Sequence, residues 1–207
     1  CTVQRHHGGL VMLSRSTTLG ALLLCSGTAY GQNHRMTPMV GPELSLGVGG
    51  QVDVSFLGLT ASADLRPTLG GGLRVSVPLH QYFAADARIA AYSWSAKDSD
   101  GRNLLVDIGV IPRARLTPVE GLEAYAGFPV GLSVSRLASG ANGGDSDGSI
   151  GVHIGLLGGA QVRLNESLSA MAEVGYLRHG ATHTLAFFEV DANVGQATMS
   201  VAMLIHL

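Results

Sequence analysis

Two long runs of alternating side chains, joined by a short turn, constrain this chain more than any other feature of its sequence. The runs span residues 104–116 and 122–134; every second residue is apolar and most of the others are polar, small or charged. Residues 117–121, Thr-Pro-Val-Glu-Gly, interrupt the alternation. A period of two residues on both sides of such a turn predicts an antiparallel hairpin. Both runs are longer than the roughly five or six residues of a typical soluble strand and suit a tilted strand that crosses a bilayer.

The composition agrees with membrane-crossing strands rather than helices. Hydrophobic residues make up 46% of the chain and charged residues only 14%, and 29 glycines argue against long helices. After the N-terminal region, no run approaches the roughly 18 apolar residues of a transmembrane helix. A barrel distributes its apolar residues over alternate positions, which produces this combination. Lys97 is the only lysine and the net charge is −2, so we expect no nucleic-acid partner.

Residues 1–31 have the pattern of an upstream segment followed by a cleavable signal peptide. Met12 is the expected start, Arg15 supplies the basic n-region, and residues 19–25 form a short apolar core. The small-x-small run at 29–31, Ala-Tyr-Gly, predicts cleavage after Gly31.

Both cysteines, Cys1 and Cys25, precede this cleavage position. The mature chain would therefore contain no disulfide, thiolate nucleophile or cysteine metal site. Leu24 occupies the position that a lipid-attachment motif requires to be small, so we do not expect a lipid on Cys25. We expect a short periplasmic arm at residues 32–42 and a β-barrel at residues 43–207.

Alternation elsewhere in the chain brings the expected number of strands to eight. The expected strands are 43–56, 64–77, 82–96, 104–116, 122–134, 149–164, 168–176 and 197–207. Tight turns at 78–81, 117–121 and 165–167 alternate with longer segments at 57–63, 97–102, 137–148 and 178–193. Short turns at one end and longer loops at the other are typical of bacterial outer-membrane barrels.

With these strands and turns, residues 43–207 resemble small OmpA-type outer-membrane proteins. The resemblance implies an all-β fold, an eight-stranded antiparallel up-and-down transmembrane β-barrel in the outer membrane of a Gram-negative cell. It also implies contact with membrane lipid and lipopolysaccharide, and recognition of the C-terminal strand by the barrel assembly machinery. Members usually end in an aromatic residue, whereas this chain ends in Leu207. Pro67, Pro112 and Pro129 fall within expected strands, where each removes a ladder donor and leaves the register open.

The polar face of the expected strands carries nearly equal numbers of acids and arginines. In a membrane barrel this face lines the interior, and eight strands leave room for side chains rather than for a channel. Arginine binds carboxylates through two parallel hydrogen bonds, whereas an unpaired interior charge is costly. We therefore expect a plugged lumen. The expected lumen charge network, with Gln161 beside it, is Asp64, Arg66, Arg74, Asp86, Arg88, Asp107, Arg113, Arg115, Glu123, Arg163 and Glu173.

Aromatic residues near expected strand ends predict two thin interfacial girdles. Such girdles occur where a barrel meets the lipid headgroups, although ordinary core packing is an alternative. The expected interfacial aromatics are Phe56, Tyr82, Phe83, Tyr92, Trp94 and Tyr176.

His179 and His183 are the strongest candidates for chemistry, with Glu173, Ser169 and Thr182 near them in sequence. A lipid-modifying acyl enzyme needs a serine, a histidine and an acid in contact. The segment His179–His183 lacks the His-x-Ser-Asn run of a lipid A deacylase and lies in the expected last loop. In a loop, a spacing of four residues does not align two histidines for a metal. We expect no catalytic residues.

Two pairs of acids, Asp98 with Asp100 and Asp145 with Asp147, lie near glycines in expected loops. They resemble fragments of a calcium-binding loop but lack its remaining ligands and its final glutamate. We expect no metal and no cofactor.

The preferred interpretation is an integral outer-membrane barrel with a structural, envelope-integrity or surface-interaction role. An alternative is a soluble secreted lipocalin-like barrel whose apolar face turns inward around an apolar ligand. A lipid-modifying barrel enzyme is a third possibility. Alternation alone does not distinguish the first two, because it does not say which face of the strands points inward.

Overall fold

The computed structural model describes residues 37–97, 101–136, 148–185 and 188–207. The chain divides into a unit of residues 1–33, which lies outside this description, and a unit of residues 34–207. The signal peptide expected at residues 1–31 therefore remains a prediction. The acid pairs expected in loops, Asp98 with Asp100 and Asp145 with Asp147, also lie outside the described residues.

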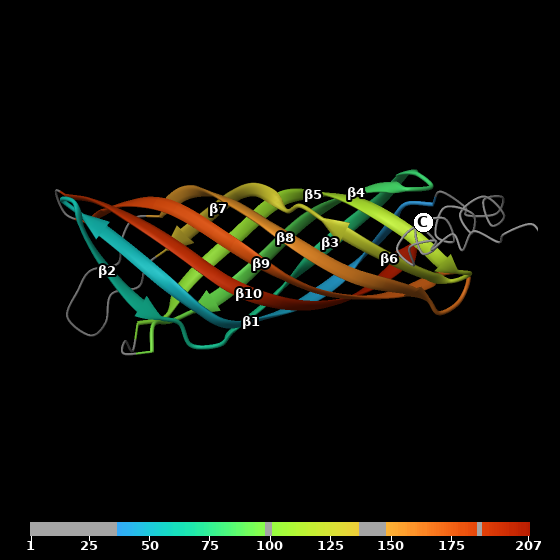
Figure 1. Ribbon diagram of the computed structural model, residues 1–207, viewed down its shortest axis with the longest axis horizontal. Coiled ribbons are helices and arrows are strands. Elements are labelled where there is room, and N and C mark those ends of the chain that lie inside the picture. The colour runs from blue at the N-terminus through green and yellow to red at the C-terminus, as the bar shows by residue number, and fades with distance from the viewer. Residues whose placement is uncertain (1–36, 98–100, 137–147, 186–187) are drawn as a thin grey trace, which may run out of the picture. The chain divides into compact units, whose positions relative to one another are not determined.

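The second unit contains a single antiparallel sheet of ten strands (Figure 1). The strands are β1 (Met39–Phe56), β2 (Leu59–Asp64), β3 (Thr68–His80), β4 (Phe83–Trp94), β5 (Asn103–Val119), β6 (Leu122–Gly127), β7 (Val130–Arg136), β8 (Ser149–Arg163), β9 (Leu168–Leu185) and β10 (Phe188–His206). Their order is β10-β9-β8-β6-β5-β4-β3-β1-β2, and β7 lies between β5 and β8. β10 also pairs with β1, from Met39 opposite His206 to Ser55 opposite Asp191.

Ten strands are present instead of the expected eight because Pro129 divides the strand expected at 122–134, and because β2 occupies most of the segment expected to be the loop 57–63. β6 and β7 follow each other between β5 and β8, separated by Phe128 and Pro129. β2 and β3 both pair with β1 and are separated by residues 65–67, which end in Pro67. A proline cannot donate to the ladder and so favours a break. Pro112 stays within β5, where it lies opposite Ala85 of β4.

Two segments that were expected to be loops are strands. β1 and β2 are joined by a tight turn at Leu57 and Gly58, both with positive φ (48° and 79°), so the loop expected at 57–63 was wrong. The loop expected at 178–193 was also wrong, because β9 continues to Leu185 and β10 begins at Phe188. Alternation was hard to detect there because polar residues occupy both faces of β9, where His179 is buried while its neighbour Arg178 is exposed. In β10 the apolar residues Val190 and Ala192 face inward, the reverse of the expected pattern.

The two ends of the sheet differ in their connections. We call one the short-turn end; it holds the turns at 81–82, 120–121 and 164–167. The last residue, Leu207, lies there too and donates its N–H to the carbonyl of Pro38 at 2.9 Å. The opposite end, called the loop end, holds the β1–β2 turn and the connections from β4 to β5, β7 to β8 and β9 to β10.

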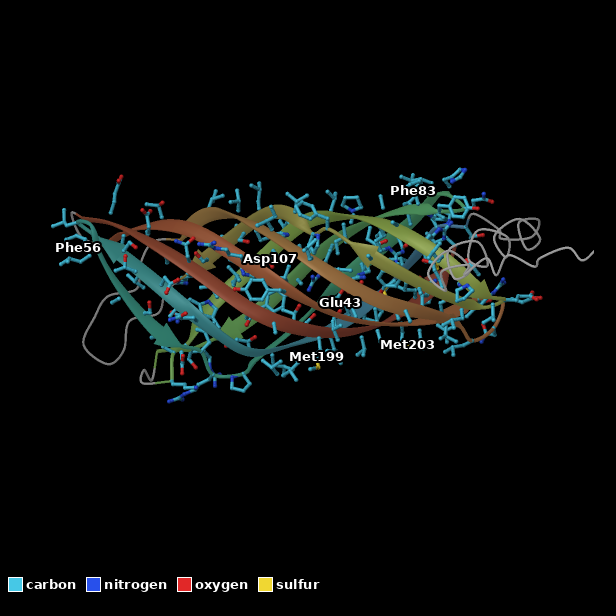
Figure 2. The ribbon with its side chains drawn as sticks, viewed as in Figure 1. Glu43, Phe56, Phe83, Asp107, Met199 and Met203 are labelled. Carbon is cyan, nitrogen blue, oxygen red and sulfur yellow. The ribbon has the colours of Figure 1, made fainter. Side chains whose placement is uncertain are left out.

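The two faces of the sheet have opposite polarity. Over most of the sheet outward side chains are apolar, as Met199 (49% exposed) illustrates, whereas inward side chains such as Glu43 and Asp107 are each 2% exposed (Figure 2). Near the loop end the polarity of β10 is reversed, with Asp191 outward and Ala192 inward. Within the described ranges, no helix has the length and apolar character needed to cross a bilayer.

Candidate functional site

Arg74 lies at the centre of the polar interior near the short-turn end. It is completely buried on β3 and faces three carboxylates. Its Nε lies 2.9 Å from Glu43 Oε2, its Nη1 lies 3.3 Å from Asp86 Oδ2, and its guanidinium binds both oxygens of Glu173 at 2.5 and 2.6 Å. The two parallel bonds to Glu173 are the strong bidentate form of this interaction.

Further arginines extend these contacts into a chain of alternating charges. Arg113 Nη2 lies 3.0 Å from Asp86 Oδ1, and Arg115 Nη1 lies 2.9 Å from Glu123 Oε2. Arg88 Nη2 lies 2.9 Å from Glu43 Oε1. We call the whole set the charge network: Glu43, Arg74, Asp86, Arg88, Arg113, Arg115, Glu123 and Glu173. Its four arginines balance its four acids, so the network carries no net charge when all are ionised.

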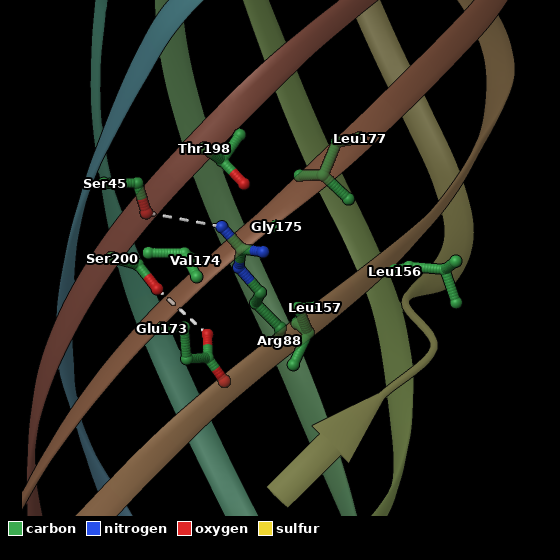
Figure 3. A pocket seen from close by; sticks show the side chains of 10 residues that line it. All are labelled: Ser45, Arg88, Leu156, Leu157, Glu173, Val174, Gly175, Leu177, Thr198 and Ser200. Carbon is green, nitrogen blue, oxygen red and sulfur yellow. Dashed lines mark hydrogen bonds between the residues drawn. The ribbon is translucent and has the colours of Figure 1, made fainter.

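Hydroxyl groups occupy remaining hydrogen-bonding positions of this network. Arg88 donates to Ser45 Oγ at 3.3 Å, and Ser200 Oγ donates to Glu173 at 2.9 Å (Figure 3). The Tyr125 hydroxyl also donates to Glu173 at 2.9 Å. The cavity lined by Ser45, Arg88, Glu173 and Ser200 has a volume of about 10 Å³, which is about the space that one water molecule needs.

The structure places eight of the expected lumen residues in the interior. These are Arg74, Asp86, Arg88, Asp107, Arg113, Arg115, Glu123 and Glu173. Seven of them belong to the charge network, whereas Asp107 lies nearer the loop end. Gln161 is buried as well. Glu43 is an interior residue that the expected network lacked, although its alternation with Leu44 and Leu46 was a signal that could have found it.

Asp64 and Arg66 were wrongly expected in the lumen. Both are exposed, and Asp64 forms an ion pair with Lys97 at 2.9 Å between side chains that are 64% and 57% exposed. Arg66 donates to the carbonyl of Lys97 at 2.8 Å. The break before Pro67 changes the phase of the chain, so that Leu65, which is 2% exposed, points inward instead.

Arg163 was also wrongly expected in the lumen. It is exposed at the last position of β8 and donates to the carbonyls of Asn165 and Glu166 in the following turn. The inward phase of β8 therefore ends at Gln161, two residues before Arg163.

A second polar set lies nearer the loop end. Ser133 Oγ donates to Asp107 Oδ1 at 2.6 Å and lies 3.2 Å from His153 Nδ1. His179 Nε2 lies 2.9 Å from Asp107 Oδ2, and the two imidazole centroids are 5.8 Å apart. We call Asp107, Ser133, His153 and His179 the histidine cluster. Each member is at most 6% exposed.

His179 and His183 were wrongly expected in a solvated loop. Both lie on β9 and point inward, 3% and 1% exposed. His183 Nε2 lies 3.0 Å from Ser135 Oγ. Long-range pairing of β9 with β8 and β10 buries them, and a single-sequence pattern with polar residues on both faces did not reveal it.

The residues considered for catalysis are not brought together. His179 contacts Asp107, Glu173 contacts Arg74, and Ser169 Oγ lies 2.8 Å from His206 Nε2. Thr182 is exposed and donates to Asp191 at 2.7 Å. Among the described residues, no group of three or more His, Cys, Asp or Glu side chains is arranged to hold a metal ion.

The histidine cluster also lacks the geometry of a hydrolase triad. A nucleophilic serine must pass its proton to a histidine, whereas the shorter contact of Ser133 is with the carboxylate of Asp107. Ser133 is 1% exposed, so a lipid substrate does not reach its hydroxyl.

The expected interfacial aromatics divide into two groups. The prediction was wrong for Tyr92 and Trp94. They are 1% and 7% exposed and pack inside with Val52, Leu105 and Val194. They share the inward phase of β4 with Asp86, which was the available signal.

The other four aromatics are at least partly exposed. Tyr82 and Phe83 lie at the short-turn end, 39% and 56% exposed, and Phe56 is half-buried beside the β1–β2 turn. Tyr176 is 54% exposed, but it lies in the middle of β9 rather than at its end.

Among known proteins, similarity to this chain was found at the level of three-dimensional structure. No family model matches the chain, and no curated protein matches it. The outer membrane protein OprG from Pseudomonas aeruginosa is similar in structure, with 12% sequence identity and a TM-score of 0.59 over 84% of this chain and 98% of OprG. Neisserial surface protein A has 15% identity and a TM-score of 0.48 over 82% of this chain and 97% of that protein. The attachment invasion locus protein Ail of Yersinia pestis has 13% identity and a TM-score of 0.40 over 80% and 99%. The likeness to OprG shows that this chain has the β-barrel fold of an outer-membrane protein.

Proposed function

We propose that this chain is an integral outer-membrane β-barrel with a structural, envelope-integrity or surface-interaction role. The observation that carries this proposal is the polarity of the sheet. Outward side chains such as Leu44, Leu69 and Ile108 are 63%, 69% and 54% exposed, while Arg74 is completely buried. Water would be a poor solvent for the outward face, whereas lipid tails would solvate it.

Strand register supports a closed barrel of eight strand positions. From Val40 of β1, paired residues lead around the sheet to Gln51 of β1, through Val75, Ala87, Val110, Val130, Ile154, Arg178 and Gly195. The path returns 51 − 40 = 11 residues further along β1. One of these residues is the extra one between Val48 and Gln51, where β1 advances by three residues and β10 by two, which leaves a stagger of 10. The interior of an eight-stranded barrel is just wide enough to be filled by side chains.

The charge network supports a plugged lumen. It crosses the interior from β1 to β9, and Arg74 alone bridges carboxylates of β1, β4 and β9. The cavity beside Arg88 measures about 10 Å³, the one beside His179 about 20 Å³, and the one at the short-turn end about 50 Å³. These volumes suit single waters or small groups of waters. We therefore propose a barrel that does not conduct ions and acts through its surface.

The soluble lipocalin-like alternative fits the structure less well. Such a barrel holds its ligand in an apolar interior, whereas salt bridges occupy the interior near the short turns. A lipid-modifying enzyme has no support in the contacts described above.

Heat-modifiability tests the proposed fold and membrane location. The full chain is refolded in detergent, and boiled and unboiled samples are compared by SDS gel. We expect a faster-migrating unboiled band that resists protease. A protein that stays soluble and monomeric without detergent would contradict the proposal and favour an apolar ligand inside a soluble barrel.

Planar-bilayer recording tests the proposed plug. Insertion of the refolded chain is expected to give no sustained current steps, because the charge network leaves no continuous water path. Long-lived openings of uniform conductance would contradict the plugged lumen while leaving the membrane barrel intact.

A further inference from the structure

Arg178 is an outward-facing charge at the edge of an apolar stretch of the barrel wall. It lies in the middle of β9, is exposed, and is paired across the sheet with Ile154 of β8 and Gly195 of β10. Ile154 and Tyr176 beside it are 48% and 54% exposed. Within the described ranges Arg178 forms no ion pair, so its charge needs a partner from outside this part of the chain.

Arg178 marks the level at which the outward face of β9 and β10 changes from apolar to polar. Toward the short-turn end, the outward residues are Ala172, Val174, Tyr176, Ala197, Met199, Val201 and Met203. Met199 and Met203 are labelled in Figure 2. Toward the loop end they are Gly180, Thr182, Glu189, Asp191 and Asn193. In a membrane barrel, such a change marks the border between lipid tails and headgroups. A charge is expensive among the tails and cheap at this border.

The side chains of Tyr176 and Asn193 each place a polar group over a glycine near Arg178. A Cβ on Gly195, the residue opposite Arg178, would collide with the Tyr176 hydroxyl, so that hydroxyl lies over Gly195. A Cβ on Gly180 would lie 3.1 Å from Asn193 Oδ1, so the amide of Asn193 lies over Gly180. The hydroxyl therefore lies over β10 at the level of Arg178, and the side chain of Asn193 lies two residues further toward the loop end.

We propose that Arg178, Tyr176 and Asn193 bind a phosphate group of lipid A in the outer leaflet. The guanidinium fork matches two phosphate oxygens, and the hydroxyl and amide supply further donors. Val174 (61% exposed), Leu156 (67%) and Met199 (49%) lie on the tail side and would contact the acyl chains. The negative charge of a phosphate complements the positive charge of Arg178, which lies at the border between lipid tails and headgroups. This proposal rests on the proposed membrane barrel.

Native mass spectrometry of the refolded full chain tests the site. The detergent-solubilised protein is titrated with lipid A, and bound copies are counted. Arg178→Gln is expected to weaken lipid A binding about tenfold, the typical effect of losing one charged hydrogen-bonding partner. Tyr176→Phe is expected to weaken it less. The matched control is Arg163→Gln, an exposed arginine at the short-turn end whose guanidinium is bonded to turn carbonyls, and it is expected to bind like the wild type.

Two lipid probes identify the group that is bound. Dephosphorylated lipid A is expected to bind the wild type as weakly as intact lipid A binds Arg178→Gln. Equal binding of phosphatidylglycerol and lipid A would overturn the assignment to lipid A, and unchanged binding by Arg178→Gln would overturn the site. The heat-modifiable band of each variant is measured in parallel. A missing band in the wild type contradicts the membrane barrel itself, whereas a normal band with unchanged binding contradicts only this site.

Discussion

The half of the interior near the short turns combines the charge network with a small apolar cluster around Met39, Met171 and Leu204, whereas the half near the loop end is held together by hydroxyls, imidazoles and a larger apolar cluster. In the first half, Arg74 meets three carboxylates and Asp86 meets two arginines. In the second half, Asp107 is the one acid of its cluster and accepts from a serine and a histidine. In the charge network Arg74 and Asp86 each contact two or more charged partners. In the histidine cluster Asp107 is the residue that contacts the other three members, Ser133, His179 and, at 3.6 Å, His153.

Apolar packing compensates for the smaller number of charges near the loop end. Val52, Leu65, Tyr92, Trp94 and Leu105 form a buried cluster with Ala90 and Val194 there. Burial of this kind is not directional and tolerates the loss of one contact. Electrostatic contacts in a buried site do not, because an unpaired charge remains desolvated. The two halves should therefore differ in how strongly single substitutions destabilise them.

The largest effect is expected for Arg74→Met. It leaves Glu43, Asp86 and Glu173 without their shared cation, and removing one partner of a buried ion pair costs about 3–5 kcal/mol. Urea unfolding, followed by the fluorescence of Trp94, the only tryptophan, measures this loss. Arg66→Met, which removes an exposed arginine, serves as the control and should cost less than about 0.5 kcal/mol. Similar losses in both variants would break the comparison.

A smaller effect is expected for Asp107→Asn in the histidine cluster. The carboxylate accepts hydrogen bonds from Ser133 and His179, and a hydrogen bond to a charged group contributes about 1.5–3 kcal/mol. The same unfolding measurement applies, with Asp191→Asn as an exposed control that accepts from Thr182. A loss as large as that of Arg74→Met would mean that the two halves do not differ.

Packing near the histidine cluster is tested by Gly131→Ala. A Cβ there would collide with the carbonyl of Ile108 and with the imidazole of His153. Overpacking of this kind costs about 1–3 kcal/mol. Gly158→Ala is the matched control, since its Cβ would come no closer than 3.7 Å to the Tyr125 carbonyl oxygen. Equal stability of the two variants would show that both the backbone at Ile108 and the ring of His153 can move aside.

The smallest effect is expected for Ser135→Ala. It removes the 3.0 Å contact with His183, a neutral hydrogen bond of the kind that contributes about 0.5–1.5 kcal/mol. Unfolding in urea again provides the value, compared with Ser62→Ala on the exposed face, which bonds Asp53. A cost above that of Asp107→Asn would contradict the ranking.

Alternation in the sequence was sufficient to predict much of the sheet, because each strand has one apolar and one polar face. It located the hairpin at Leu104–Val134 and placed Arg74 and Glu173 on the polar side. Alternation failed to predict strands where the polarity of a residue does not indicate whether it is buried. Near the loop end β9 carries polar residues on both faces, and in β10 the apolar residues Val190, Ala192 and Val194 face inward instead of outward, so the pairing of the two strands is what reveals them.

The interior contacts were less predictable than the strands. Which acid meets which arginine depends on register between segments far apart, as with Arg74 and Glu173. The phase change at Leu65 arises from one break before Pro67 and moved Asp64 and Arg66 to the outside. For Tyr92 the sequence did contain the right signal. Its position in the alternation matches that of Asp86 and predicts an inward side chain, whereas its aromatic character had suggested a place at the membrane interface.

The pairing of β1 with β10 also governs the order in which this chain can complete its sheet. Met39 lies opposite His206, a separation of 206 − 39 = 167 residues, whereas β9 and β10 are neighbours in the chain. Closing a short loop loses less chain entropy than joining distant segments. Hairpins such as β3–β4 and β9–β10 can therefore form early, and the seam between β1 and β10 closes last. Until β10 is available to pair with β1, the sheet stays open, and the chain must be kept from aggregating through its apolar face.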